Sequence, residues 1–156
     1  MREHRGAAIS RWLASSTEHP ERAYEDWKRG TPAVLRTGVR FDAVRMPPQL
    51  VHAALGTATA DDLPAALKGQ LDGPVIADWA TCYYALVPVG TCAAWREPVG
   101  TMRGAGGWVG VPRLDQRGPD GVHWITPAAA PGHLCRPDYV AALLHRGRAR
   151  LEGIPQ

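Results

Sequence analysis

The clearest pattern of hydrophobic residues lies between Gly73 and Gly90, in the stretch GPVIADWATCYYALVPVG. Two β-prone runs, 74–79 and 83–87, flank a short turn at 80–82, and glycine and proline mark both ends. The second run carries large side chains on both of its faces, which is typical of a strand inside a sheet rather than at its edge. The pattern therefore predicts a β-hairpin whose second strand is central.

Two short helices are expected before this hairpin, at the N-terminus. Apolar residues spaced at i, i+3 and i+4 predict an amphipathic helix over residues 6–15. A second helix is expected from Pro20, where a missing N–H costs nothing, to Gly30. We interpret the chain as one domain spanning 1–156, with 1–19 as a candidate helical extension.

The segment that follows alternates strands and helices. Residues 33–36 and 39–45 read as strands, and two prolines at 47–48 then begin a helix that ends at Gly56. A strand followed at once by a helix is half of a βαβ unit. Leucines at i, i+4 and i+8 predict a further helix within 63–71, before the hairpin.

The C-terminal third has weaker signals. Residues 91–107 are rich in glycine and small side chains and are expected to form a long loop with one short element at most. Short strands are predicted at 108–112 and 122–126, as candidates to pair with each other, and Asp138 is expected to cap a final helix. The fold class is therefore α+β, a single domain with a mixed or antiparallel central sheet, a βα unit and a hairpin, flanked by helices.

Composition adds limits on the class of protein. The 156 residues are 45% hydrophobic and 21% charged, as in ordinary folded domains, and the apolar runs are too short to span a bilayer. The first residues do not lead into a signal-like apolar segment, so we expect a cytoplasmic protein with no membrane partner. The three cysteines contain no CxxC pair, which favours reduced thiols over a zinc module or a disulfide framework. The six tryptophans are spread along the whole chain and are expected to be mostly buried or half-buried anchors.

The formal net charge is +3, and the positive residues are almost all arginine, since Lys28 and Lys68 are the only lysines. Arginine suits phosphate binding, but the same bias, together with abundant alanine, glycine and proline, also fits high-GC codon usage. Both explanations stay open on composition alone.

Carboxylates are the first candidates for chemistry. Transfer of phosphoryl or nucleotidyl groups needs acidic side chains that hold divalent ions, and the candidate catalytic set here is Asp42, Asp78 and Asp115. This set would require Mg²⁺ or Mn²⁺ as a cofactor. The alternative is that these aspartates face solvent or cap turns, in which case no cofactor is expected and no residue is assigned as a metal ligand.

Basic residues are the second candidates. Arg36, Arg40 and Arg45 fall in one segment with Trp27 and Phe41, and this combination suits phosphate or single-stranded nucleic acid. Arg103, in a glycine-rich stretch, is a further candidate because glycine lets backbone amides approach an anion. The alternative interpretation of the same segment is an ordinary solvated edge.

Several other chemistries lack their sequence signature. The glycines around Arg103 run into a strand rather than a helix, which excludes the phosphate-loop and dinucleotide patterns. The only serines lie near the N-terminus, outside any nucleophile elbow. His133 and Cys135 form one close pair of metal-ligand types without a second pair, and Cys82 has no histidine near it in sequence.

Three blocks of the chain together resemble the bifunctional DNA primase–polymerase (prim-pol) domain, in its short, divergent actinobacterial form. They are PAVLRTGVRFDAVRMP at 32–47, GPVIADWATCYYALVP at 73–88 and GWVGVPRLDQRGPDGVHWITP at 107–127. In such domains the first block carries metal-binding carboxylates, the hairpin turn of the second brings a nucleotide-contacting histidine, and the third adds an acidic residue. The resemblance implies a prim-pol-like α+β fold.

Only Asp42 matches the residues that this family uses. The hairpin turn here has no histidine, and Arg45 stands where related sequences often carry a second acid, so a positive charge opposes cation binding. The leading hypothesis is a catalytically degenerate prim-pol-like module that binds nucleic acid or nucleotide or acts as a regulatory subunit. The alternatives are an active metal-dependent nucleotidyltransferase with an altered metal site, and a subunit that binds another protein.

Overall fold

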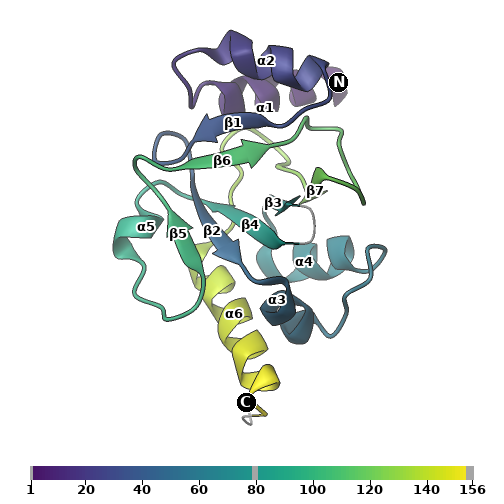
Figure 1. Ribbon diagram of the computed structural model, residues 1–156, viewed down its shortest axis with the longest axis vertical. Coiled ribbons are helices and arrows are strands. Elements are labelled where there is room, and N and C mark those ends of the chain that lie inside the picture. Colours follow the sequence, from purple (N-terminus) through teal and green to yellow (C-terminus); the bar gives the residue numbers. More distant parts are fainter. Residues whose placement is uncertain (1, 79–80, 154–156) are drawn as a thin grey trace.

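Five strands form the central sheet of the protein, in the order β5-β2-β4-β3-β7, and each neighbouring pair is antiparallel. The structure is a computed structural model that describes residues 2–78 and 81–153, with side chains from His4 onward (Figure 1). The strands of this sheet are β2 (Asp42–Met46), β3 (Val75–Asp78), β4 (Cys82–Val87), β5 (Thr101–Arg103) and β7 (Val122–Thr126).

The expected hairpin is the centre of this sheet. β3 and β4 pair antiparallel, and β4 lies between β2 and β3 with all of its residues buried, so the prediction of a central second strand is confirmed. Residue 79, the last of the first expected run, and residue 80, the first of the expected turn, lie outside the described residues. The prediction that Trp79 is an anchor therefore also lies outside them. The expected βα unit is formed by β2 and α3. β2 and β3 run parallel, but β4 separates them instead of leaving them hydrogen-bonded neighbours.

One face of the sheet is covered by helices. α3 (Pro48–Leu55), α4 (Leu63–Leu71) and α6 (Pro137–Leu151) pack their apolar sides on it, forming the first hydrophobic core. Gly147 of α6 lies against the backbone of Leu50 in α3, where a Cβ atom would overlap the carbonyl oxygen of Leu50. Glycine is therefore required at this helix crossing.

The opposite face carries a second layer. A two-stranded ribbon, β1 (Ala33–Arg36) with β6 (Trp108–Val111), covers part of it, and α1 (Arg2–Ala14) and α2 (Pro20–Lys28) complete the second hydrophobic core (Figure 1). Leu13 of α1 is 1% exposed, so the first helix contributes to this core.

Buried tryptophans attach the ribbon to this core. The indole N–H of Trp27 donates to the carbonyl of Val111, and that of Trp124 donates to the carbonyl of Pro112. Trp12 and Trp95 are half-buried, as expected, whereas Trp108 is exposed.

Four local predictions were wrong. Asp138 does not cap the final helix, because α6 begins at Pro137 and its N-cap residue is Arg136. Residues 39–41 are not part of a strand, because they lie in a tight turn. In this turn Gly38 has a positive φ, and the N–H of Gly38 donates to the carbonyl of Phe41. The strands at 108–111 and 122–126 do not pair with each other, since β6 pairs with β1 and β7 with β3. The long loop after Gly90 contains two elements, α5 (Thr91–Ala94) and the edge strand β5. Among the described residues, no helix combines the length and apolar character needed to cross a membrane.

Candidate functional site

Two of the four candidate arginines stand side by side on the central sheet. Arg45 of β2 is opposite Thr101 of β5, and Arg103 is opposite Ala43, so the two arginines are diagonal neighbours across this strand pair. Diagonal neighbours on one sheet face are about 7–8 Å apart at Cα, within reach of long side chains. Both arginines are exposed, and Ala43 belongs to the second core, which places them on that face of the sheet.

Tyr84 of β4 lies beside this pair and orders it. The Arg103 guanidinium is 5.9 Å from the centre of the Tyr84 ring, a cation–π distance. The Tyr84 side chain is 7% exposed, and burial raises the pKa of its hydroxyl. A hydrogen bond with the Cys82 side chain raises the pKa of the Arg45 guanidinium.

Neither arginine of this pair is neutralised by an acidic neighbour. Within residues 2–78 and 81–153, no carboxylate oxygen comes within 4.0 Å of Arg45 or Arg103, whereas Arg29, Arg113 and Arg148 each have such a partner. The sheet face at β2 and β5 therefore carries two positive charges that are available to an anion. We call Arg45, Arg103 and Tyr84 the arginine face.

The other two candidate arginines lie elsewhere and have partners. Arg36 on β1 has its Nη1 atom 3.6 Å from a Glu18 carboxylate oxygen and stacks over the Trp108 ring at 5.1 Å. Arg40 donates from Nε to the Ser15 hydroxyl oxygen at 2.9 Å. Both contact the turn that follows α1. The four arginines predicted from the sequence thus form two separate pairs.

Asp42, the one acidic residue carried over from the prim-pol resemblance, has a structural partner. Its side chain is 1% exposed, and Oδ2 accepts the backbone N–H groups of Gly90 at 3.1 Å and Cys92 at 2.9 Å. Oδ1 is buried and has no hydrogen-bond partner among the described residues. Asp42 therefore holds the start of α5 against the start of β2.

The three candidate catalytic aspartates do not converge. Asp42 is opposite Val87 at one end of β4, and Asp78 is opposite Cys82 at the other end. From Cys82 to Val87 the strand advances by five residue steps, which corresponds to about 17 Å. Asp115 lies in the loop between β6 and β7, where it is exposed and ion-paired with Arg113. In the described part of the chain, no three His, Cys, Asp or Glu side chains form a group able to hold a metal ion.

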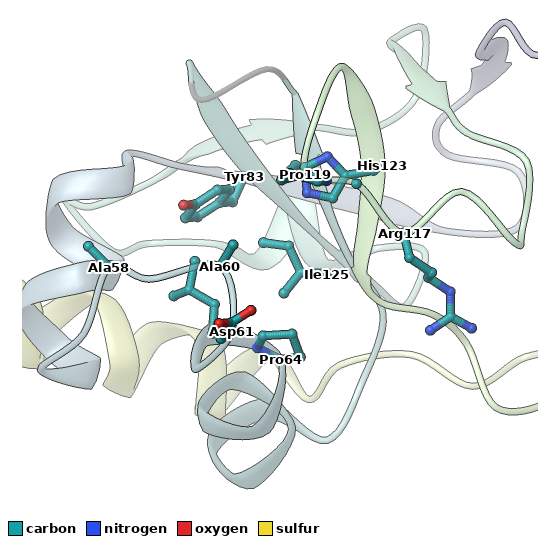
Figure 2. Close-up of a pocket in the computed structure, with 12 residues that line it drawn as sticks. Ala58, Ala60, Asp61, Pro64, Tyr83, Arg117, Pro119, His123 and Ile125 are labelled. Carbon is teal, nitrogen blue, oxygen red and sulfur yellow. The ribbon is translucent and has the colours of Figure 1, made fainter.

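On the other face of the sheet the fold assembles a pocket that no sequence pattern indicated. Its volume is about 370 Å³, and it lies between the α3–α4 connection, the start of α4, and the loop that precedes β7 (Figure 2). Four of the lining side chains are polar and can ionise, and most of the others are small or apolar. The polar four are Asp61, Tyr83, Arg117 and His123.

A neutral hydrogen-bonded pair closes one side of this pocket. The Tyr83 hydroxyl is 2.7 Å from Nε2 of His52, which projects from α3. Burial lowers the pKa of His52 below its ordinary value of 6.5 and raises the pKa of Tyr83 above its ordinary value of 10.0. Both shifts favour the uncharged form of each group, so the pair contributes polarity without charge.

His123 is held in a defined orientation. Its Nδ1 atom is 3.0 Å from the carbonyl oxygen of Gly121, and because a carbonyl only accepts, Nδ1 carries the proton. Gly118 lies so close that a Cβ atom there would overlap the imidazole ring. In the neutral imidazole, Nε2 is therefore a hydrogen-bond acceptor. The hydrogen bond to Gly121 and the contact with Gly118 together fix the position of the ring.

The two charged residues of the pocket differ in their contacts. Asp61 is exposed and has no hydrogen bond or ion pair within the described residues, although the neighbouring Asp62 accepts from the Thr59 hydroxyl. Arg117 donates from Nε to the carbonyl of Leu114 at 3.3 Å, and its guanidinium points away from the other labelled side chains (Figure 2). Within the described residues neither of these two charges has an ion-pair partner, so the pocket carries one unpaired carboxylate and one unpaired guanidinium.

Sequence reasoning missed this pocket because four separated segments supply its lining. Each of its polar residues is unremarkable within its own segment, and only the fold brings them together. Comparison with known protein families, with curated proteins and with solved structures gives no significant match to this chain.

Proposed function

We propose that this chain is a non-catalytic, prim-pol-like module of the cytoplasm that binds single-stranded nucleic acid through the phosphates. The observation that carries this proposal is the arginine face, where Arg45 and Arg103 are exposed, adjacent and without a carboxylate partner in the described residues. A guanidinium presents a planar fork of donors that matches a phosphate group. Two such groups side by side can contact neighbouring phosphates of one strand.

The surroundings of Arg45 and Arg103 favour contact with the phosphate backbone of the nucleic acid over readout of its bases. Tyr84 is only 7% exposed, so its ring supports Arg103 from below and leaves little surface on which a base could stack. Phosphate contacts position a nucleic acid without reading its sequence. We therefore expect weak sequence preference and strong dependence on salt.

The proposal gives no catalytic role to Asp42, because its carboxylate already accepts two backbone N–H groups. The alternative of a metal-dependent nucleotidyltransferase, with Mg²⁺ or Mn²⁺ held by Asp42, Asp78 and Asp115, receives no geometric support. The first two aspartates lie at opposite ends of β4.

Fluorescence anisotropy with a labelled single-stranded oligonucleotide, measured over a range of salt concentrations, tests the proposal. The double variant Arg45→Ala/Arg103→Ala should bind roughly 30-fold more weakly if each phosphate contact contributes about 1 kcal/mol. Its plot of log affinity against log salt should also be shallower by about 1.4, because two phosphate contacts are lost.

The matched control is Arg29→Ala/Arg148→Ala. Arg29 and Arg148 are also exposed, each pairs with a carboxylate, and their removal changes the net charge by the same amount. This control should keep the affinity within about twofold of the wild type, because an exposed ion pair contributes little. Equal weakening in both double variants would mean that only net charge matters, and the arginine face would then have no special role.

A second candidate function, binding of another protein, is favoured by one specific observation. Val34 and Trp108 are 61% and 47% exposed on the outer side of the β1–β6 ribbon, where their neighbours across the strands are Gly110 and Arg36. Exposed large apolar residues of this kind are typical of protein contact surfaces. If the wild-type protein failed to bind the oligonucleotide even at low salt, this second function would become the better one.

A further inference from the structure

We infer that the pocket containing Asp61, Tyr83 and His123 binds a small organic cation, a guanidinium or primary ammonium group on a short apolar stem. This inference does not rest on the proposed function, because the arginine face lies on the opposite face of the sheet. The cores show this separation: Tyr83 belongs to the core under the helices, and Tyr84 belongs to the core under the ribbon.

The size of the pocket suits such a ligand. A volume of about 370 Å³ lies at the lower end of the range for small-molecule sites, which is roughly 300–1,000 Å³. The walls combine apolar surface from Pro64, Pro119 and Ile125 with a small number of polar groups. Figure 2 shows these three side chains and the carboxylate of Asp61 around the same space.

Apart from Arg117, whose guanidinium points away from the other labelled side chains (Figure 2), the polar groups of the pocket match a hydrogen-bond donor. The Asp61 carboxylate is acceptor-only, and His123 presents Nε2 as an acceptor because its Nδ1 donates to Gly121. The Tyr83 hydroxyl is engaged by His52, and burial keeps both of these groups uncharged. A ligand that donates several hydrogen bonds therefore fits better than one that accepts them.

The charges also favour a cation. Asp61 has no ion pair within the described residues, so its charge is not neutralised there. The Arg117 guanidinium points away from Asp61 and lines the adjoining cavity that contains Lys68 (Figure 2). A positive group placed at the Asp61 carboxylate therefore gains a charge-assisted hydrogen bond.

A metal ion does not fit the same groups. Asp61 is the one carboxylate of the pocket, and no described cluster of three His, Cys, Asp or Glu side chains could hold a metal. The apolar walls would face a hydrated ion without compensation. An organic cation, by contrast, places its stem against these walls and its charge at Asp61.

Two-dimensional ¹H–¹⁵N NMR of the full chain, titrated with N-propylguanidinium and separately with N-propylurea, tests this inference. The two probes have nearly the same shape, but only the first is charged. The guanidinium should shift amide signals within 58–64 and 117–125, and the urea should bind at least about fivefold more weakly. Asp61→Asn should weaken guanidinium binding by a similar factor.

Asp120→Asn is the matched control, because Asp120 is an exposed carboxylate in the same loop as Arg117 but does not line the pocket. It should leave the affinity within about twofold of the wild type. The inference is overturned if the urea binds as tightly as the guanidinium, if Asp61→Asn binds like the wild type, or if the shifted signals lie outside the pocket. Because the spectrum itself reports folding, loss of structure in a variant is recognised directly, and the comparison of the two probes on the wild type then decides.

Discussion

The buried carboxylate of Asp42 offers the sharpest test of whether this chain keeps a catalytic site. Asp42 is 1% exposed and accepts two backbone N–H groups, from Gly90 and Cys92, at the start of α5. Replacing it by alanine removes both acceptors at once. Asp42→Asn keeps the shape and one oxygen but removes the charge.

The expected magnitudes follow from these contacts. A hydrogen bond to a charged group contributes about 1.5–3 kcal/mol, and a buried N–H without a partner costs about 1–3 kcal/mol. Gly90 is exposed, so its amide N–H can bond to water instead, while Cys92 is half-buried. The costs of losing the two hydrogen bonds therefore do not add in full. We expect Asp42→Ala to lower the free energy of unfolding by about 2–4 kcal/mol and Asp42→Asn by about 1–2 kcal/mol.

Urea-induced unfolding followed by tryptophan fluorescence measures both values, in the presence and absence of Mn²⁺. If Asp42 is a structural partner of α5, the wild-type midpoint does not change with Mn²⁺, because no binding energy is linked to folding. The reasoning is refuted if Asp42→Ala stays within about 0.5 kcal/mol of the wild type. It is equally refuted if Mn²⁺ stabilises the wild type but not Asp42→Asn, since that result would identify a metal ligand.

Two further predictions concern stability. Gly147→Ala should destabilise the protein by about 1–3 kcal/mol in the same unfolding assay, because the new methyl group overlaps the carbonyl of Leu50. The matched variant Gly69→Ala, at a helix position with open space, should instead stabilise the protein by about 0.5–1 kcal/mol. If both variants gain stability, the close approach of α6 to α3 is wrong. Burial lowers the pKa of His52, so below pH 6.5 the unfolded chain binds a proton at this residue more readily than the folded chain does. The contribution of His52 to the free energy of unfolding should therefore be complete above pH 6.5 and decrease as the pH falls below it. Unfolding curves at several pH values should show a smaller fall for His52→Gln, and an equal fall would contradict the neutral buried imidazole.

Local sequence patterns were enough to identify most helices and strands. The i, i+4, i+8 leucines gave α4, the proline and glycine at the ends gave α3, and alternation with bulk on both faces gave the central strand β4. These signals succeed because helix caps, turn residues and the side-chain period depend on neighbours a few positions away. They failed at residues 39–41, where a positive φ at Gly38 starts a turn inside an apolar run.

The sequence by itself determined the α+β class and the charge of Arg45 and Arg103, but only the tertiary structure decided which side chains share a surface. Because β5 pairs with β2, Arg103 lies beside Arg45. Arg36 and Arg40 instead contact the turn after α1. The same long-range pairing separated Asp42 from Asp78 along β4. The physical reason is that strand order and layer packing depend on contacts between segments distant in the chain, and no local pattern records them.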